Sequence, residues 1–213
     1  MTGYDQATID GLLSRLGTLA QRRRLVAVAG PPGSGKSTLC DQLVQALNDR
    51  QPGIAAVVPM DGFHFDDAVL RARGTLDRKG APHTFDVGGL AAMLARLRAN
   101  TEEEIAVPVF DRDLEIARAG ARLIPASTPL LLIEGNYLLL DRQPWLQLKP
   151  CFDLTIRLEV PRAELERRLL DRWLGLGLAT EVAMAKALGN DLPNADLVAS
   201  SSRPADITLR QQG

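Results

Sequence analysis

Residues 24–38 read RLVAVAGPPGSGKST, and this stretch decides the fold of the chain. It begins with a short apolar run, continues through the spacing Gly30-x-x-x-x-Gly35-Lys36-Ser37, and leads into a segment with helical character. A strand, this glycine-rich turn and a helix in that order form a P-loop, in which backbone N–H groups surround a chain of phosphates. The start of the helix adds the positive end of its dipole. The stretch therefore predicts a site for a nucleoside triphosphate.

The side chains of this loop have separate predicted roles. Lys36 supplies a point charge to the outer phosphates, and the hydroxyl of Ser37 can ligate Mg²⁺. We expect Lys36 to act in catalysis as well as in binding. The nucleotide-binding set that we predict is Gly30, Pro31, Pro32, Gly33, Ser34, Gly35, Lys36, Ser37 and Thr38.

The composition is typical of one globular domain over residues 1–213. Of the 213 residues 46% are apolar and 24% charged, and the formal net charge is −1, so the chain lacks the basic surface that nucleic acid attracts. No apolar run approaches the roughly 18 residues that a membrane-spanning helix needs, and the N-terminus does not resemble a signal peptide. Two cysteines, Cys40 and Cys151, do not form a disulfide framework. We therefore expect a cytoplasmic protein without nucleic-acid partners or membrane insertion; the sequence leaves open whether it is a monomer or a dimer.

Apolar runs alternate with segments of helical spacing along the chain. The runs predict strands at residues 25–29, 54–59, 104–110, 129–134, 152–160 and 206–209. The spacing predicts helices over residues 5–22, 36–47, 66–73, 90–97, 161–173, 179–188 and 190–200. Such alternation is typical of a parallel α/β sheet whose helices cross over its faces, and we expect residues 74–85 to form a loop.

Polar residues follow the predicted strands, where open α/β sheets bind their ligands. Asp61 follows the second strand, the pair Asp111-Arg112 the third, and Glu134 the most apolar one. A carboxylate beside the phosphates can accept the proton of an attacking hydroxyl, which makes Asp61 the best candidate for a general base. We place Glu134, with Ser37 and Asp61, in the Mg²⁺ site. An Asp-Gly turn for Asp61 and a capping or surface role for Glu134 stay open.

Two arginines on the predicted helix at residues 161–173 are candidates for clamping phosphates. Arg168 and Arg172 are four residues apart and share a helix face beside its apolar stripe, so we predict that both are catalytic. The run GLGLA at residues 175–179 supplies a flexible break, as a lid requires. The alternative is ordinary charge on a helix surface.

The polar, turn-rich segment at residues 78–86 could cover a second, small substrate. A plain surface loop explains the same composition almost as well. His64, in the stretch MDGFH, could contact that substrate or could be a packing residue.

Taken together, the segments GPPGSGKST, MDGFH, RKGAPHTFD, PVFDRDLE, LLIEGNY and RRLLDR resemble the phosphoribulokinase/uridine kinase branch of P-loop kinases, which includes type I pantothenate kinases. They occur in the family's order and span residues 24–173. The tail GNDLPNADLVASSSRPADI resembles a bacterial subgroup of fructose- or nucleoside-kinase-like proteins, some of them linked to sugar transport.

The resemblance implies a P-loop three-layer sandwich, with a mainly parallel five-stranded sheet and a helical lid. It implies ATP with Mg²⁺ as cofactors, and phosphoryl transfer to a hydroxyl of a small metabolite, such as fructose or a nucleoside, with Asp61 as general base. The residues that it places around the acceptor, in addition to His64, are Lys79, His83, Asp86 and Arg112. Uridine kinases carry a tyrosine where this chain has Phe110, and a histidine where it offers Glu115 or Arg118, which weakens uridine as the acceptor. Arg112 followed by the acidic Asp113 and Glu115 would suit a polyol or sugar at least as well.

The sequence lacks the motifs of two other classes of P-loop protein. A nucleotide switch usually carries Asn-Lys-x-Asp for guanine, and a transport ATPase carries Leu-Ser-Gly-Gly-Gln; neither occurs here. The preference for ATP over GTP is implied by the resemblance alone.

Overall fold

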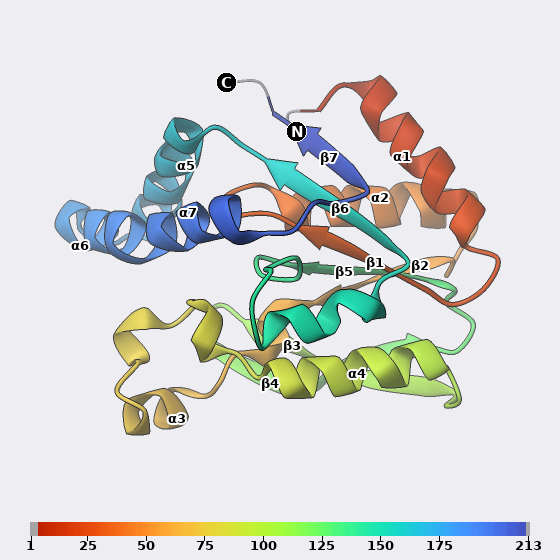
Figure 1. Ribbon diagram of the computed structural model, residues 1–213, viewed down its shortest axis with the longest axis horizontal. Coiled ribbons are helices and arrows are strands. Elements are labelled where there is room, and N and C mark those ends of the chain that lie inside the picture. The colour runs from red at the N-terminus through yellow and green to blue at the C-terminus, as the bar shows by residue number, and fades with distance from the viewer. Residues whose placement is uncertain (1–3, 212–213) are drawn as a thin grey trace.

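Five parallel strands form the centre of the protein, in the spatial order β2-β5-β1-β6-β7 (Figure 1). Their bounds are β1 (Arg24–Ala29), β2 (Ala55–Pro59), β5 (Leu130–Gly135), β6 (Leu154–Glu159) and β7 (Ile207–Arg210). The computed structural model describes residues 4–211. The predicted α/β class and parallel five-stranded sheet are confirmed.

The central strands are buried on both faces, which is why they read as unbroken apolar runs. All residues of β5, and β1 from Leu25 onward, are buried. Alternate residues of β1 enter opposite cores, with Leu25 in one and Val26 in the other. Helices α1 (Gln6–Leu19) and α2 (Lys36–Arg50) supply the second of these cores. Helix α4 (Val87–Ala99) and the 3₁₀ helix Trp145–Cys151 supply the first, which completes the three layers (Figure 1).

Strand β3 (Glu104–Asp111) pairs antiparallel with β4 (Ile116–Pro125), in a hairpin separate from the main sheet. A strand at 104–110 is confirmed, but it is not a strand of the parallel sheet, so Arg112 comes from a hairpin tip and not from the sheet rim. We did not predict β4, because most of its residues face solvent and the strand therefore has no apolar run.

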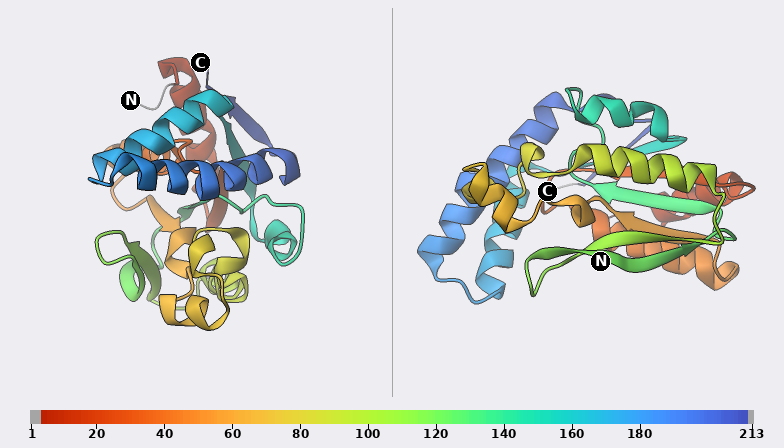
Figure 2. Two further views of the ribbon diagram at one scale, coloured as in Figure 1. Left: turned by 90° about the vertical axis from the view of Figure 1, so that its left-hand side faces the viewer. Right: turned by 90° about the horizontal axis from the view of Figure 1, so that it is seen from below.

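The C-terminal helices project beyond the carboxyl ends of the strands (Figure 1). Helix α5 (Arg162–Gly175) is followed by α6 (Thr180–Lys186), a π-helical turn at Ala187–Asp191, and α7 (Leu192–Ser201). The two helices predicted at 179–188 and 190–200 are thus joined without a break. Figure 2 shows this helical arm, residues 162–201, opposite the segment 60–86 that carries α3 (Asp67–Ala72). The predicted loop at 74–85 contains two short 3₁₀ helices, Leu76–Arg78 and Pro82–Thr84.

Candidate active site

The P-loop turns sharply between β1 and α2. Gly35, the residue before α2, has a φ of 84°, in the left-handed region that glycine adopts without strain. The hydroxyl of Ser34 is buried and has no hydrogen-bond partner in the described part of the chain. Among the described residues no side chain caps the start of α2, so its first backbone N–H groups are available to phosphate oxygens.

Lys36 extends its ammonium into this turn and is only 9% exposed. Its Nζ donates to Asn136 Oδ1 at 2.6 Å and to the Pro31 carbonyl at 3.4 Å. Burial lowers the pKa of Lys36, while the nearby carboxylates of Glu134 and Asp61 oppose that shift. The ammonium is therefore costly to bury without a stronger anionic partner, which the outer phosphates of a nucleotide would provide.

Glu134, near the end of β5, meets the start of α2. Its Oε2 accepts a hydrogen bond from the Ser37 hydroxyl at 3.2 Å, and the residue is 8% exposed. Burial raises the pKa of Glu134, and the charge of Lys36 opposes that shift. A hydroxyl and a carboxylate oxygen this close fit the ligand chemistry of Mg²⁺. Residues 4–211 contain no group of three or more His, Cys, Asp or Glu suited to a metal. Phosphate oxygens and water would complete the shell of a metal here, and a contribution from Asp61 stays a prediction.

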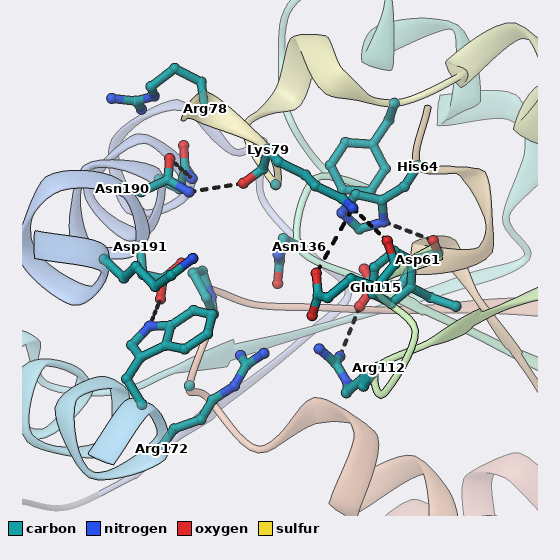
Figure 3. Close-up of a pocket in the computed structure, with 18 of the residues that line it drawn as sticks. Asp61, His64, Arg78, Lys79, Arg112, Glu115, Asn136, Arg172, Asn190 and Asp191 are labelled. Atoms are coloured by element: carbon teal, nitrogen blue, oxygen red, sulfur yellow. Dashed lines mark hydrogen bonds and ion pairs between the residues drawn. The ribbon is translucent and has the colours of Figure 1, made fainter. Parts of the chain in front are cut away.

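Asp61 lies in the 3₁₀ helix Met60–Phe63, directly after β2. The next residue, Gly62, packs against the hairpin so closely that a Cβ there would lie 2.3 Å from the Pro108 carbonyl oxygen. This close approach lets the hairpin tip reach the site. Arg112 Nη2 donates to Asp61 Oδ2 at 3.0 Å (Figure 3).

His64 packs between two phenylalanine rings beside Asp61. Its ring centroid is 4.0 Å from that of Phe85 and 4.6 Å from that of Phe110. Its Nδ1 lies 2.7 Å from the Asp61 carbonyl oxygen. Burial lowers the pKa of His64, so the neutral ring is favoured. The contact orients the backbone that carries Asp61.

These groups surround one cavity of about 840 Å³. The predicted site residues that line it are Pro32, Gly33, Gly35, Lys36, Ser37, Thr38, Asp61, His64, Lys79, Arg112, Glu134 and Arg172. Residues from the P-loop, β5, the hairpin, the 78–86 segment and the helical arm thus meet at the carboxyl end of the sheet (Figure 3).

Six other predicted residues do not line the cavity: Gly30, Pro31, Ser34, His83, Asp86 and Arg168. Arg168 lies behind the P-loop, where it donates to the Gly33 carbonyl at 3.3 Å and to Gln211 Oε1 at 2.8 Å. The Asp86 carboxylate caps α4 by accepting from the Gly89 N–H at 2.8 Å. His83 is exposed. Asp86 and Arg168 therefore hold structural elements in place in this conformation.

Several residues that line the cavity were not predicted from the sequence. They include Asn136, Trp173, Lys186, Asn190, Asp191 and Asn194. Asn136 stands two residues after Glu134 at a strand end, a position that could have indicated it. Asn190 and Asn194 have the i, i+4 spacing of one helix face, and that is a weak signal without the fold.

The side of the cavity formed by the 78–86 segment and the hairpin tip carries charged groups that are already paired with one another. Lys79 Nζ donates to Asp67 Oδ1 at 2.7 Å and to the Glu115 carbonyl at 2.6 Å. Glu115 has a φ of 55°, which is uncommon for a residue other than glycine and often marks a functional site. By contrast, Arg172 forms no ion pair within residues 4–211 and is free to meet an anion.

No helix in residues 4–211 combines the length and the apolar character needed to cross a bilayer.

Three relatives are similar to this chain over most of its length. A crystal structure titled "putative fructose transport system kinase", from Silicibacter sp. TM1040, is 46% identical, has a TM-score of 0.86, and is matched over 98% of both chains. The "Uncharacterized protein YggC" of Escherichia coli (strain K12) is 37% identical over 89% of this chain and 78% of its own. The "Putative uridine kinase C227.14" of Schizosaccharomyces pombe is 32% identical over 97% of this chain and 92% of its own. No family model matches the chain. The similarity therefore extends well beyond the P-loop.

Proposed function

Because the chain belongs to the phosphoribulokinase/uridine kinase family of P-loop kinases, we propose that its acceptor is a sugar or polyol, such as fructose. The chain is an ATP-dependent small-molecule kinase that uses ATP with Mg²⁺. A nucleoside is the second candidate acceptor, supported by the similarity to the "Putative uridine kinase C227.14" of Schizosaccharomyces pombe.

The preference for a sugar rests on the aromatic rings around the cavity, which already pack against other side chains of the protein. A nucleobase is bound most readily by stacking on an aromatic face. Phe85 and Phe110 already pack against His64, and Trp173 lies beneath the cations of Arg172 and Lys186 at 5.1 and 4.7 Å. Polar groups that can bind hydroxyls, among them Asn194 and Glu115, line the same space. This pattern supports a polyhydroxylated acceptor without a base.

In the proposed reaction Asp61 accepts the proton of the acceptor hydroxyl. The hydroxyl oxygen forms a bond to the γ-phosphorus of ATP as the bond to the bridging oxygen breaks, and ADP leaves with that electron pair. The Arg112 guanidinium, now paired with Asp61, must give way to the acceptor, and it is then positioned to hold another acceptor oxygen. General-base catalysis of this kind contributes about 10²–10⁴-fold to the rate.

The other proposed roles are electrostatic. Lys36 and Arg172 neutralise charge on the phosphates, and Ser37 and Glu134 hold the metal. When bound, Mg²⁺ neutralises the outer phosphates and orients them for in-line transfer. Trp173 and its neighbours in the helical arm exclude water, which limits hydrolysis of ATP.

The location in the cell and the domain organisation are also proposals. Cys40 and Cys151 are free thiols, which supports a reducing cytoplasm. We propose one kinase domain over residues 1–213, with the hairpin and the helical arm as its insertions.

Acceptor-dependent release of ADP tests the proposed function. The protein is assayed with ATP and Mg²⁺ against D-fructose, other sugars, polyols, nucleosides and pantothenate. We expect a sugar or polyol to raise ADP release well above the rate without acceptor. Stimulation by a nucleoside alone would move the assignment to the second candidate. Turnover that no acceptor changes would instead favour a nucleotide switch or a transport-associated ATPase.

A further inference from the structure

The loop at residues 79–82 is held by its backbone carbonyls. The Tyr137 hydroxyl donates to the Gly80 carbonyl at 2.6 Å, and Trp145 Nε1 donates to the Pro82 carbonyl at 3.2 Å. A third donor, Asn190 Nδ2, binds the Lys79 carbonyl at 2.9 Å (Figure 3). Three donors from three separate elements thus fix four consecutive residues.

These three donors belong to different parts of the molecule. Tyr137 and Trp145 are 0% and 1% exposed, and their ring centroids are 5.2 Å apart in the main core. Asn190 instead lies on the π-helical turn of the helical arm. One further hydrogen bond joins the arm to the loop segment, from Arg78 Nη1 to the Gly189 carbonyl at 3.3 Å, and this bond is exposed to solvent. Asn190 therefore makes the shorter and better shielded of these two connections between the arm and the loop.

The other end of the arm is bound to the nucleotide side. Arg168 on α5 donates to the P-loop carbonyl of Gly33. Trp173, also on α5, donates from Nε1 to Asp191 Oδ2 at 2.7 Å. Asp191 is the neighbour of Asn190 on the π turn, and such turns occur often at functional sites. A continuous set of hydrogen bonds therefore leads from the P-loop, through α5 and the π turn, to the loop.

The loop, in turn, fixes the acceptor side. Lys79 uses its carbonyl for Asn190 and its ammonium for Asp67 and for the carbonyl of Glu115 at the hairpin tip. A shift of the arm would thus move Lys79 and the hairpin tip together.

We propose that Asn190 is a positioning residue, which couples the helical arm to the loop at 79–82 so that nucleotide binding orders the acceptor side before the acceptor arrives. The proposal rests on the proposed roles of the P-loop and of the 78–86 segment. Because such coupling is reciprocal, an acceptor that orders the loop also tightens nucleotide binding, typically by a factor of about 5–150.

Hydrogen exchange of backbone amides tests this without a known acceptor. The amides of Lys79, Ala81 and Thr84 are bonded locally to the carbonyls of Leu76, Arg78 and Ala81, so their exchange reports opening of the loop. The probe is Mg²⁺ with a non-hydrolysable ATP analogue. We expect the analogue to slow exchange of these amides at least about fivefold in the wild type, the lower end of typical coupling. In Asn190→Asp, whose carboxylate cannot donate to the Lys79 carbonyl, we expect the analogue to slow exchange of these amides less than about twofold.

The matched control is Asn48→Asp, the same change at the opposite end of the sheet. Asn48 Nδ2 also donates to a backbone carbonyl, that of Ala55, at 3.0 Å. This variant should keep the wild-type response of the loop to the nucleotide. A second variant, Trp173→Phe, keeps an aromatic ring but removes the donor to Asp191. It should lose the protection of the loop by nucleotide as Asn190→Asp does, and it replaces Asn190→Asp in the test if Asn190→Asp does not fold.

The proposal is overturned if the nucleotide leaves loop exchange unchanged in the wild type. It is also overturned if Asn190→Asp, or Trp173→Phe in its place, keeps full protection. Failure of the proposed function looks different, since the analogue would then still protect the loop while no sugar or polyol stimulates ADP release.

Discussion

The two walls of the cavity are built in opposite ways. The phosphate wall, residues 30–38, is one consecutive turn that uses backbone N–H groups and one buried ammonium. The acceptor wall brings together residues 61–64, 78–80, 110–115 and 189–194, and it uses side chains paired with one another. A continuous turn can be recognised as a motif, whereas an assembled wall has no local signature. We therefore expect nucleotide binding to depend on the first wall and acceptor choice on the second.

The largest expected effect is at Asp61, where a substitution should change turnover without changing nucleotide binding. We expect Asp61→Asn to lower turnover about 10²–10⁴-fold, because the amide cannot accept the proton of the hydroxyl. ATP affinity should stay near wild type, because the phosphate wall is unchanged. Steady-state ADP release and nucleotide titration measure the two quantities. Asp113→Asn, in the same hairpin tip that contacts Asp61 but outside the cavity, is the control. Wild-type turnover in Asp61→Asn would remove this residue from the mechanism.

The next effect belongs to the phosphate wall. We expect Lys36→Met to lower turnover by about 10²–10³, the usual loss when one electrostatic donor to a transition state is removed. The free energy of unfolding should change little, because methionine removes a costly buried charge while the buried Glu134 loses its nearby cation. Denaturant unfolding checks this, with the exposed Lys149→Met as control. A clear loss of stability would show that the ammonium supports the fold rather than the nucleotide.

A smaller effect is expected at the metal. Glu134→Gln keeps the size of the side chain but removes its charge, and we expect the Mg²⁺ concentration for half-maximal turnover to rise about tenfold or more. Titration of Mg²⁺ at saturating ATP measures the shift. Glu103→Gln, an exposed change far from the cavity, should leave the titration where it is in the wild type. An unshifted curve for Glu134→Gln would argue that this carboxylate is structural.

The smallest effect is a pH dependence of stability that arises in the acceptor wall. Burial lowers the pKa of His64 below 6.5, so the unfolded chain takes up a proton near pH 6.5 that the folded chain binds only at lower pH. The free energy of unfolding should therefore fall as the pH decreases below 6.5. His64→Gln should lose less stability than the wild type between about pH 7 and about pH 5.5. Denaturant unfolding at both pH values tests this. Equal slopes for the wild type and His64→Gln would contradict the account.

Much of the fold could be predicted from local sequence. The run at 129–134 and the P-loop indicated the central strands, because residues buried on both faces must be apolar without interruption. Strand β4 could not be found in this way, since only Ile124 in it is buried. Because β4 was not predicted, Arg112 was expected at the rim of the parallel sheet, whereas it lies at the tip of the β3–β4 hairpin.

The candidate site could be predicted less completely. Helical spacing grouped Arg168 with Arg172, but only Arg172 lines the cavity, because Arg168 is drawn to Glu164 and to the P-loop carbonyl of Gly33. The roles of both arginines stay predictions. Asn190 could not be identified, because its partner is the carbonyl of Lys79, 111 residues away in the chain.

Analysis of the reaction products by ³¹P NMR tests the central claim most directly. With ATP, Mg²⁺ and the sugar that stimulates ADP release most strongly, we predict a sugar phosphate ester formed in step with ADP by the wild type and at least about a hundredfold more slowly by Asp61→Asn. Inorganic phosphate as the sole product, or an ester formed at the wild-type rate by Asp61→Asn, would contradict the account.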